Sequence, residues 1–131
     1  MEKNQFHVTM SSSKNVEQVI SDLEKSLQEI KFGVLWKFDI HKKLEEKNIP
    51  FKKKITILEV CNPEEAFGIL DLEPMASYFL PCKIVVTEEA TNTKIGLIRP
   101  SLLIGLMEDE ELNKVAEIIE EKLITAMENA I

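Results

Sequence analysis

Two cysteines are the residues of this sequence whose chemistry is easiest to specify. Cys61 ends the apolar segment ITILEVC and directly precedes Asn62-Pro63. Cys82 begins the apolar segment CKIVV, directly after Pro81. Asn62 is a favourable N-cap residue and proline suits the first helical position, so a helix is predicted to start beside Cys61. Partial positive charge at that helix start favours the thiolate form of Cys61 over the thiol. Cys61 and Asn62 are therefore candidate redox or ligand-binding residues, and Cys82 is a third candidate because its thiol could lie close to that of Cys61.

The chemistry open to the two thiols depends on how their strands lie. If segments 54–61 and 82–89 are antiparallel neighbours, the end of the first meets the start of the second. The sulfurs would then be close enough for a disulfide or for sharing a soft metal. If the strands are parallel neighbours, Cys61 and Cys82 lie at opposite ends of the sheet and form no joint site. The alternative for each thiol is inert packing, because a buried free cysteine behaves as a small hydrophobic residue.

Other templates for catalysis or metal binding are missing. The sequence has no C-x-x-C, no G-x-S-x-G and no G-x-x-x-x-G-K-[ST], and its four glycines argue against a phosphate-binding loop. His7 and His41 lie on different predicted elements, so neither is an evident third ligand for a metal at Cys61 and Cys82. The sequence therefore indicates no cofactor, and it favours a protein that is not an enzyme.

Composition indicates one soluble globular domain spanning residues 1–131. The chain is 44% hydrophobic and 30% charged, and its net charge is −7. An acidic balance opposes nucleic-acid binding, which needs a positive footprint on phosphates. The segment FKKK (51–54) with Lys42 and Lys43 could form a local basic patch, or it could be a solvated helix end and strand start.

The chain shows no targeting or membrane-spanning segment. Residues 1–15 lack the apolar core of a signal peptide. The longest apolar stretch, 95–107, is too short to cross a bilayer and contains Arg99 and Pro100. We therefore expect a cytoplasmic protein without a membrane partner, in which the cysteines are thiols.

Hydrophobic periodicity predicts the elements that must position these residues. Alternation predicts strands over 6–10, 32–40, 54–61, 82–89 and 94–100. Spacings of three and four predict amphipathic helices over 16–30 and 109–131. Short helices are expected over 41–48 and from residue 62, an irregular connection is expected over 71–81, and segment 101–107 is ambiguous.

The order β-α-β-α-β-α-β-β-α indicates an α+β fold. We expect a mostly antiparallel sheet of about five strands with helices packed on one face. Strand 54–61 is apolar on both faces and should be central. The turn at 90–93 should join its flanking strands as a hairpin. Trp36 and Phe38 share one face of their predicted strand with Val34 and are expected in the core.

Four segments carry a resemblance to a known family. These are IKFGVLWKFDIHKKLEEKNI, ILEVCNPEEAFGIL, YFLPCKIVVTEE and KIGLIRP, and the CNP and LPC neighbourhoods of the cysteines are the most specific parts. Together the segments resemble the bacterial and archaeal family called domain of unknown function 302, over nearly the whole chain. The resemblance implies a fold similar to the TATA-binding-protein-like class and a homodimer. It implies no activity.

Two functions follow from these observations. The first is a small binding or interaction domain whose curved sheet holds an unidentified ligand or partner. The alternative is a thiol-based redox or metal-handling protein that uses Cys61 and Cys82.

Overall fold

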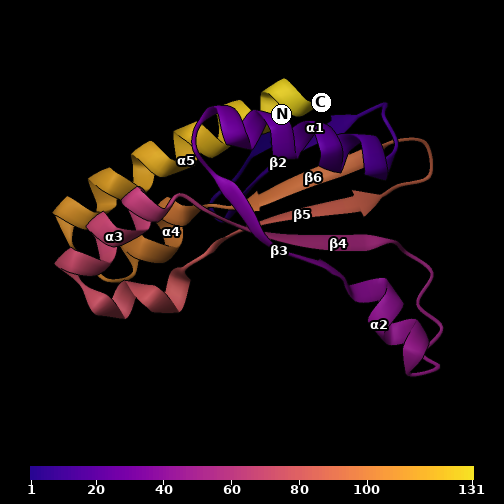
Figure 1. The fold of residues 1–131 in the computed structure, drawn as a ribbon, viewed down its shortest axis with the longest axis horizontal. Helices are drawn as coiled ribbons and strands as arrows, with labels where there is room; N and C mark the ends of the chain where they lie inside the picture. The colour runs from indigo at the N-terminus through magenta and orange to yellow at the C-terminus, as the bar shows by residue number, and fades with distance from the viewer.

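The computed structural model describes all residues from Met1 to Ile131. Its strands are β1 (Glu2–Lys3), β2 (His7–Ser12), β3 (Gly33–Asp39), β4 (Ile55–Cys61), β5 (Cys82–Glu88) and β6 (Thr93–Ile98). Its helices are α1 (Val16–Glu29), α2 (Ile40–Glu46), α3 (Pro63–Leu72), the 3₁₀ helix η1 (Pro74–Phe79), α4 (Pro100–Gly105) and α5 (Glu110–Ala130). Figure 1 shows their arrangement.

All six strands join one antiparallel sheet in the order β1-β2-β6-β5-β4-β3. The predicted α+β class is therefore confirmed, as are the internal position of β4 and the β5–β6 hairpin. The sheet has one strand more than the sequence indicates, because the two-residue β1 pairs with β2. So short a segment carries no periodicity from which a strand could be predicted.

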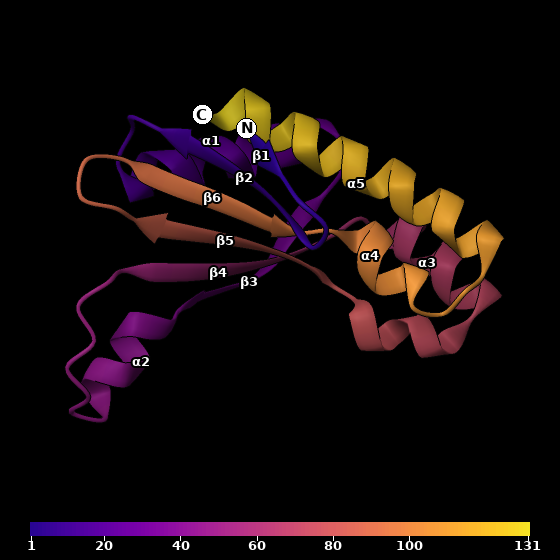
Figure 2. The same ribbon diagram turned by 180° about the vertical axis from the view of Figure 1, so that it is seen from behind.

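The helices that cover the sheet lie on one of its faces. Figures 1 and 2 show α1 and α5 side by side above the strands, and no helix crosses the opposite face. Residues of β4 alternate accordingly: Leu58 and Val60 are fully buried under the helices, whereas Ile57 is only half-buried on the other side. We call these two sides the covered face and the open face. The 26 buried hydrophobic residues form a single core.

A β-bulge in β3 overturns the prediction for the two aromatic residues. The register shifts between Val34 and Trp36, so that Val34 pairs with Val60 but Trp36 pairs with Glu59. Val34 therefore faces the core, whereas Trp36 and the following Phe38 lie on the open face. Trp36 is 54% exposed and stacks on Phe38 with ring centroids 5.1 Å apart. The expectation that both aromatics belong to the core was wrong, because strict alternation fails at a bulge.

Prolines determine where two short helices begin. Pro74 starts η1, and the Glu73 carboxylate accepts a hydrogen bond from Met75 N–H at 3.1 Å. This segment falls in the stretch expected to be irregular. Pro100 starts α4 within the ambiguous segment. In both cases the fixed φ of proline suits the first helical turn, where its missing N–H is not needed.

A buried carboxylate connects β6, α4 and α5. Glu120 is 3% exposed and accepts hydrogen bonds from Arg99 Nε at 3.1 Å and from Ser101 Oγ at 2.6 Å. Arg99 also donates to the carbonyls of Asn4 and Gln5. The cluster thus compensates a buried charge and fixes the N-terminal segment against the end of the sheet.

The helix α2 projects from the body as part of an arm (Figure 1). None of its residues is buried. Its base is held by two bonds: Ile55 N–H donates to His41 Nδ1 at 3.0 Å, and Thr56 Oγ1 donates to Asp39 at 2.6 Å. None of the helices in this chain combines the length and the apolar composition needed to cross a bilayer.

Candidate functional site

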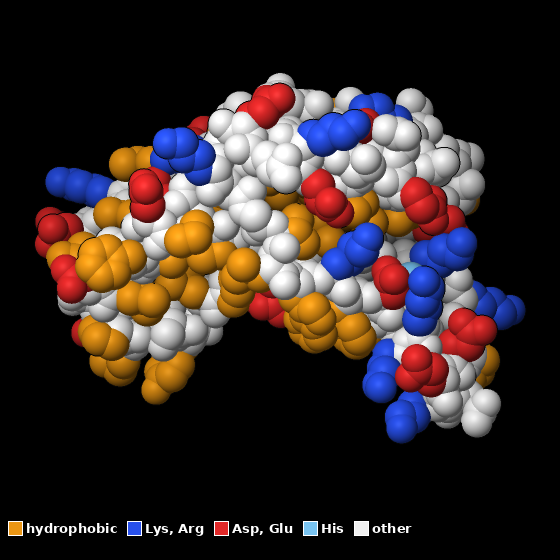
Figure 3. Space-filling model, viewed as in Figure 1, with side chains coloured by type: hydrophobic (Ala, Val, Ile, Leu, Met, Phe, Trp, Pro, Cys, Tyr) orange, Lys and Arg blue, Asp and Glu red, His pale blue; other side chains and the backbone are white.

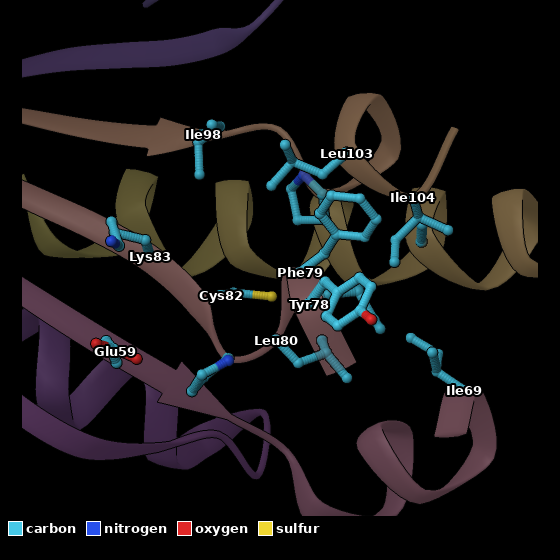
Figure 4. Close-up of a pocket in the computed structure, with 14 residues that line it drawn as sticks. Glu59, Ile69, Tyr78, Phe79, Leu80, Cys82, Lys83, Ile98, Leu103 and Ile104 are labelled. Carbon is cyan, nitrogen blue, oxygen red and sulfur yellow. The ribbon is translucent and has the colours of Figure 1, made fainter. Parts of the chain in front are cut away.

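An apolar cavity lies beyond the end of the sheet, where strands and helices diverge. It has a volume of about 300 Å³, and ten of its fourteen lining residues are hydrophobic. The lining comes from β4, β5, β6, α3, η1, α4 and α5, and Figure 4 shows its principal side chains. They are Glu59, Ile69, Tyr78, Phe79, Leu80, Pro81, Cys82, Lys83, Ile98, Pro100, Leu103, Ile104, Ala116 and Ile119.

Local sequence signals position the helical wall of this cavity. Asn62 Oδ1 accepts hydrogen bonds from the N–H groups of Glu64 and Glu65, at 3.0 and 3.2 Å. The predicted N-cap is therefore confirmed, and it fixes the start of α3. The chain then turns through η1 and returns as β5, so that α3 and η1 supply Ile69 and Phe79 from one side while α4 supplies Leu103 and Ile104 from the other.

Cys82 lies at the inner end of the cavity. Its side chain comes from the first residue of β5 and points into the space beside Phe79 (Figure 4). The residue is only 8% exposed. Burial, with a smaller contribution from neighbouring Cys61, raises the pKa of the Cys82 thiol to about 12. Cys82 therefore enters the site as a neutral, polarisable apolar group.

Cys61 does not carry the activated thiolate that its position before a helix suggests. Partial burial raises its pKa, so the expectation of a lowered pKa was wrong. The physical reason is that the carboxamide of Asn62 takes two N–H groups at the start of α3. Burial then acts on the Cys61 thiol without a compensating hydrogen bond.

The two cysteines lie at the same end of the sheet but are not bonded. β4 and β5 are antiparallel neighbours, as the joint site requires, and Cys82 is the direct partner of Val60. Both thiols are free, and both border a small void of about 10 Å³. Because side chains alternate along a strand, a register that pairs Cys82 with Val60 does not set Cys61 directly opposite it. Nowhere in the chain do three or more His, Cys, Asp or Glu side chains form a metal-binding group.

Two opposite charges border the cavity where it meets the sheet. Glu59 and Lys83 are direct cross-strand partners on β4 and β5, and both line the cavity. Neither makes an ion pair or a side-chain hydrogen bond within the molecule. Tyr78, which also lines the cavity, is 80% exposed. The site thus combines an apolar interior with a carboxylate, an ammonium group and a phenol that remain free to bind other groups.

Most of this site is not indicated by the sequence. Of the three residues predicted for a site, Cys82 lines the cavity directly, Asn62 caps one of its walls, and Cys61 lies next to it at the smaller void. Tyr78, Leu103 and Ile104 were missed, because they lie in segments without clear periodicity. The available signal was the grouping of Pro74, Pro81 and Pro100, which marks short turns that converge on one end of the sheet.

Comparisons with known proteins agree with this fold. The family model described as domain of unknown function DUF302 matches residues 8–130. A crystal structure of an uncharacterized conserved protein DUF302 from Bacillus stearothermophilus is similar, with 42% sequence identity and a TM-score of 0.94. The similarity covers 96% of this chain and 98% of that chain. No curated protein matches. On these grounds the chain belongs to the DUF302 family.

Proposed function

We propose that this protein is a binding domain for a small, largely apolar molecule held in the cavity between the sheet end and α3, η1 and α4. The observation that carries the proposal is the cavity itself. Small-molecule sites are typically concave, mostly apolar spaces of about 300 to 1,000 Å³ with a few polar groups that fix orientation. A cavity of about 300 Å³ bordered by Glu59, Lys83 and Tyr78 has these properties.

The lining specifies the chemistry of the ligand. Phe79, Leu103 and Ile104 offer apolar contacts, and the neutral Cys82 thiol adds no charge. Where the cavity meets the end of the sheet, the Lys83 ammonium can donate to a ligand and the Glu59 carboxylate can accept from one. The best fit is therefore a compact apolar or aromatic molecule with one polar group that both accepts and donates hydrogen bonds.

The thiol-based alternative has less support. Fast thiol chemistry requires a thiolate, and the pKa values of both cysteines are raised. A metal at Cys61 and Cys82 would need further ligands that the surrounding residues do not supply. Cys82 fits better as part of the apolar lining.

The proposal is tested by filling the cavity. Leu103→Trp places a larger side chain in it, whereas Leu106→Trp is the matched control, since Leu106 is 68% exposed next to the same helix and lies outside the cavity. The probe is 1-anilinonaphthalene-8-sulfonate, titrated with fluorescence detection. We expect one saturable site, a dissociation constant raised by at least about tenfold in Leu103→Trp, and no change in Leu106→Trp.

Circular dichroism establishes that each variant is folded. If Leu103→Trp does not fold, Ile98→Phe fills the cavity from the sheet instead. Equal probe binding by the filled and control variants would show that the dye binds elsewhere and would contradict the proposal.

A further inference from the structure

A second cleft lies between the helix α1 and the base of the arm (residues 40–54). It has a volume of about 450 Å³, and only two of its eleven lining residues are hydrophobic. The lining residues are Val16, Glu17, Ile20, Ser21, Glu24, Lys37, Asp39, His41, Lys42, Lys54 and Thr56. Figure 3 shows carboxylates and lysines interspersed on the surface between α1 and α2. This cleft is therefore polar and ionic, in contrast to the apolar cavity described above.

The wall on the sheet side follows from the bulge in β3. After the bulge, Lys37 pairs with Leu58, and Asp39 pairs with Thr56. Direct antiparallel partners share one face of a sheet, so Lys37 and Asp39 lie on the covered face. Their partners on β4 are at most 2% exposed. Since β3 is an edge strand, the core ends there, and two ionisable residues occupy positions at which the inner strands carry buried residues.

The opposite wall is one face of α1. Glu17, Ser21 and Glu24 follow one another at spacings of four and three residues, so they lie on the same side of the helix. Glu17 and Glu24 are two turns apart, about 10 Å along the helix axis. Carboxylates at that separation suit two cationic groups of an extended molecule better than a single metal ion, and no metal-binding group of side chains is present in the chain.

Some ionic groups of the cleft are already paired within the chain. Asp39 accepts a hydrogen bond from Thr56 Oγ1 at 2.6 Å and lies 3.4 Å from Lys42 Nζ. Lys54 Nζ lies 3.9 Å from the carboxylate of Glu88. These contacts hold the base of the arm and leave these groups less available to a ligand.

The other ionic groups of the cleft have no partner. Glu17, Glu24 and Lys37 make no ion pair and no side-chain hydrogen bond within the chain, although all three border the same cleft. His41 is held by Ile55, whose N–H donates to Nδ1 at 3.0 Å, and its Nε2 is unpaired. The free charges are therefore two carboxylates and one ammonium group, with a net charge of −1.

We propose that this cleft binds a small molecule with two cationic groups and one carboxylate, which is the charge pattern of a basic amino acid. Glu17 and Glu24 accept hydrogen bonds from the cationic groups at the two ends of the ligand, and Lys37 donates to its carboxylate. Hydrogen bonds between ionised groups are the strongest available to an exposed cleft. The ligand charge of +1 neutralises the free groups, and the net charge of −7 on the protein attracts such a ligand.

Ligand analogues test this inference on the wild-type protein. The probes are L-arginine and L-citrulline, which has the same shape but an uncharged side chain. Amide chemical shifts measured by NMR at low ionic strength report binding. We expect saturable shifts within residues 16–24 and 37–42 with arginine, and a dissociation constant at least about tenfold higher for citrulline.

Two variants assign the contacts to the protein groups. Glu17→Gln/Glu24→Gln keeps the shape of both side chains and should raise the dissociation constant of arginine by at least about tenfold. The matched control, Glu29→Gln/Glu117→Gln, makes the same charge change at exposed positions outside the cleft and should alter it by no more than about twofold. Lys37→Met should weaken the binding of arginine but not that of agmatine, which lacks the carboxylate.

Three results would overturn the inference. Equal affinities for arginine and citrulline, or equal losses in Glu17→Gln/Glu24→Gln and its control, would mean that arginine is attracted only by the overall negative charge. No saturable shift at up to about 10 mM arginine would mean that the cleft holds no such ligand. The inference does not depend on the apolar cavity, so either proposal can fail without the other.

Discussion

The two faces of the sheet differ in what their side chains do. On the covered face, Leu58, Val60, Ile84, Val86, Ile95 and Leu97 are all fully buried beneath the helices. On the open face, Trp36 is 54% exposed and Ile57 is half-buried, although both are large apolar residues. The core is complete without the open face. We therefore expect the exposed aromatic residues on this face to contribute little to the stability of the fold.

The largest expected difference between the faces concerns the two cysteines. We expect Cys82 in a Cys61→Ser background to react with iodoacetamide at pH 8 about a thousandfold more slowly in the folded than in the unfolded chain. The reason is that a pKa raised from an ordinary value near 9 to about 12 lowers the thiolate population by that factor. Cys61 in a Cys82→Ala background should be slowed much less, since it is only partly buried.

The raised pKa of Cys82 also makes the stability of the fold depend on pH. The fold favours the neutral Cys82 thiol, so this contribution is fully present below the unfolded pKa near 9 and is lost as pH rises toward 12. Removing the thiol in Cys82→Ala should make the free energy of unfolding less dependent on pH in that window. Rapid alkylation of native Cys82 at pH 8 would contradict both expectations and revive the thiol-based function.

Adjacent residues of β4 provide the next comparison. Leu58→Ala should lower the free energy of unfolding by about 3 kcal/mol, because it leaves a cavity in the core. Ile57→Ala, one residue away on the open face, should cost about 1 kcal/mol. Urea denaturation of both variants at one protein concentration measures the difference. Equal losses would mean that the open face is also part of the core.

Buried and exposed charge can be compared in the same way. Glu120→Ala should cost about 2 kcal/mol, because Arg99 and Ser101 lose a charged acceptor while Arg99 keeps two carbonyl partners. Glu46→Ala removes the exposed pair with Lys43 and should change stability by no more than about 0.5 kcal/mol. A loss in Glu46→Ala as large as that in Glu120→Ala would show that the arm is more tightly held than its exposure indicates.

An effect smaller than that of Glu120→Ala is expected in the wall of the cavity. Asn62→Ala removes two hydrogen bonds to the start of α3 and should cost about 1 kcal/mol in thermal or urea unfolding. Asn62→Asp keeps an acceptor at the N-cap and should be close to wild type. If Asn62→Asp is as destabilised as Asn62→Ala, the residue acts through something other than the cap.

Sequence periodicity predicted the elements whose burial is regular. The apolar stripe of α1 and the alternation of β4 are local patterns, because one face of each element packs on the same core. The cap at Asn62 is also local, because its hydrogen bonds go to residues two and three positions along the chain. The bulge in β3 has no local signal, and so Trp36 was assigned to the wrong face. Periodicity is also absent from η1 and α4, which are too short to show it.

The cavity could not be predicted for a different reason. Its lining comes from seven elements, and residues as far apart as Glu59 and Ile119 meet only after the chain has folded. Cys82 was recognised as a site candidate from its chemistry. Its surroundings depend on how the helices pack beyond the sheet, and no spacing in the sequence encodes that arrangement.

The central claim, that the cavity binds a small apolar ligand, is tested most directly by isoleucine methyl NMR. Four isoleucines line the cavity, namely Ile69, Ile98, Ile104 and Ile119, whereas Ile84 and Ile95 lie in the same core away from it. Titration with 1-anilinonaphthalene-8-sulfonate should shift the δ1 methyl signals of the four cavity residues and leave those of Ile84 and Ile95 in place. Shifts confined to Ile55 and Ile57 on the open face, or no saturable shift at the four cavity residues, would contradict the account.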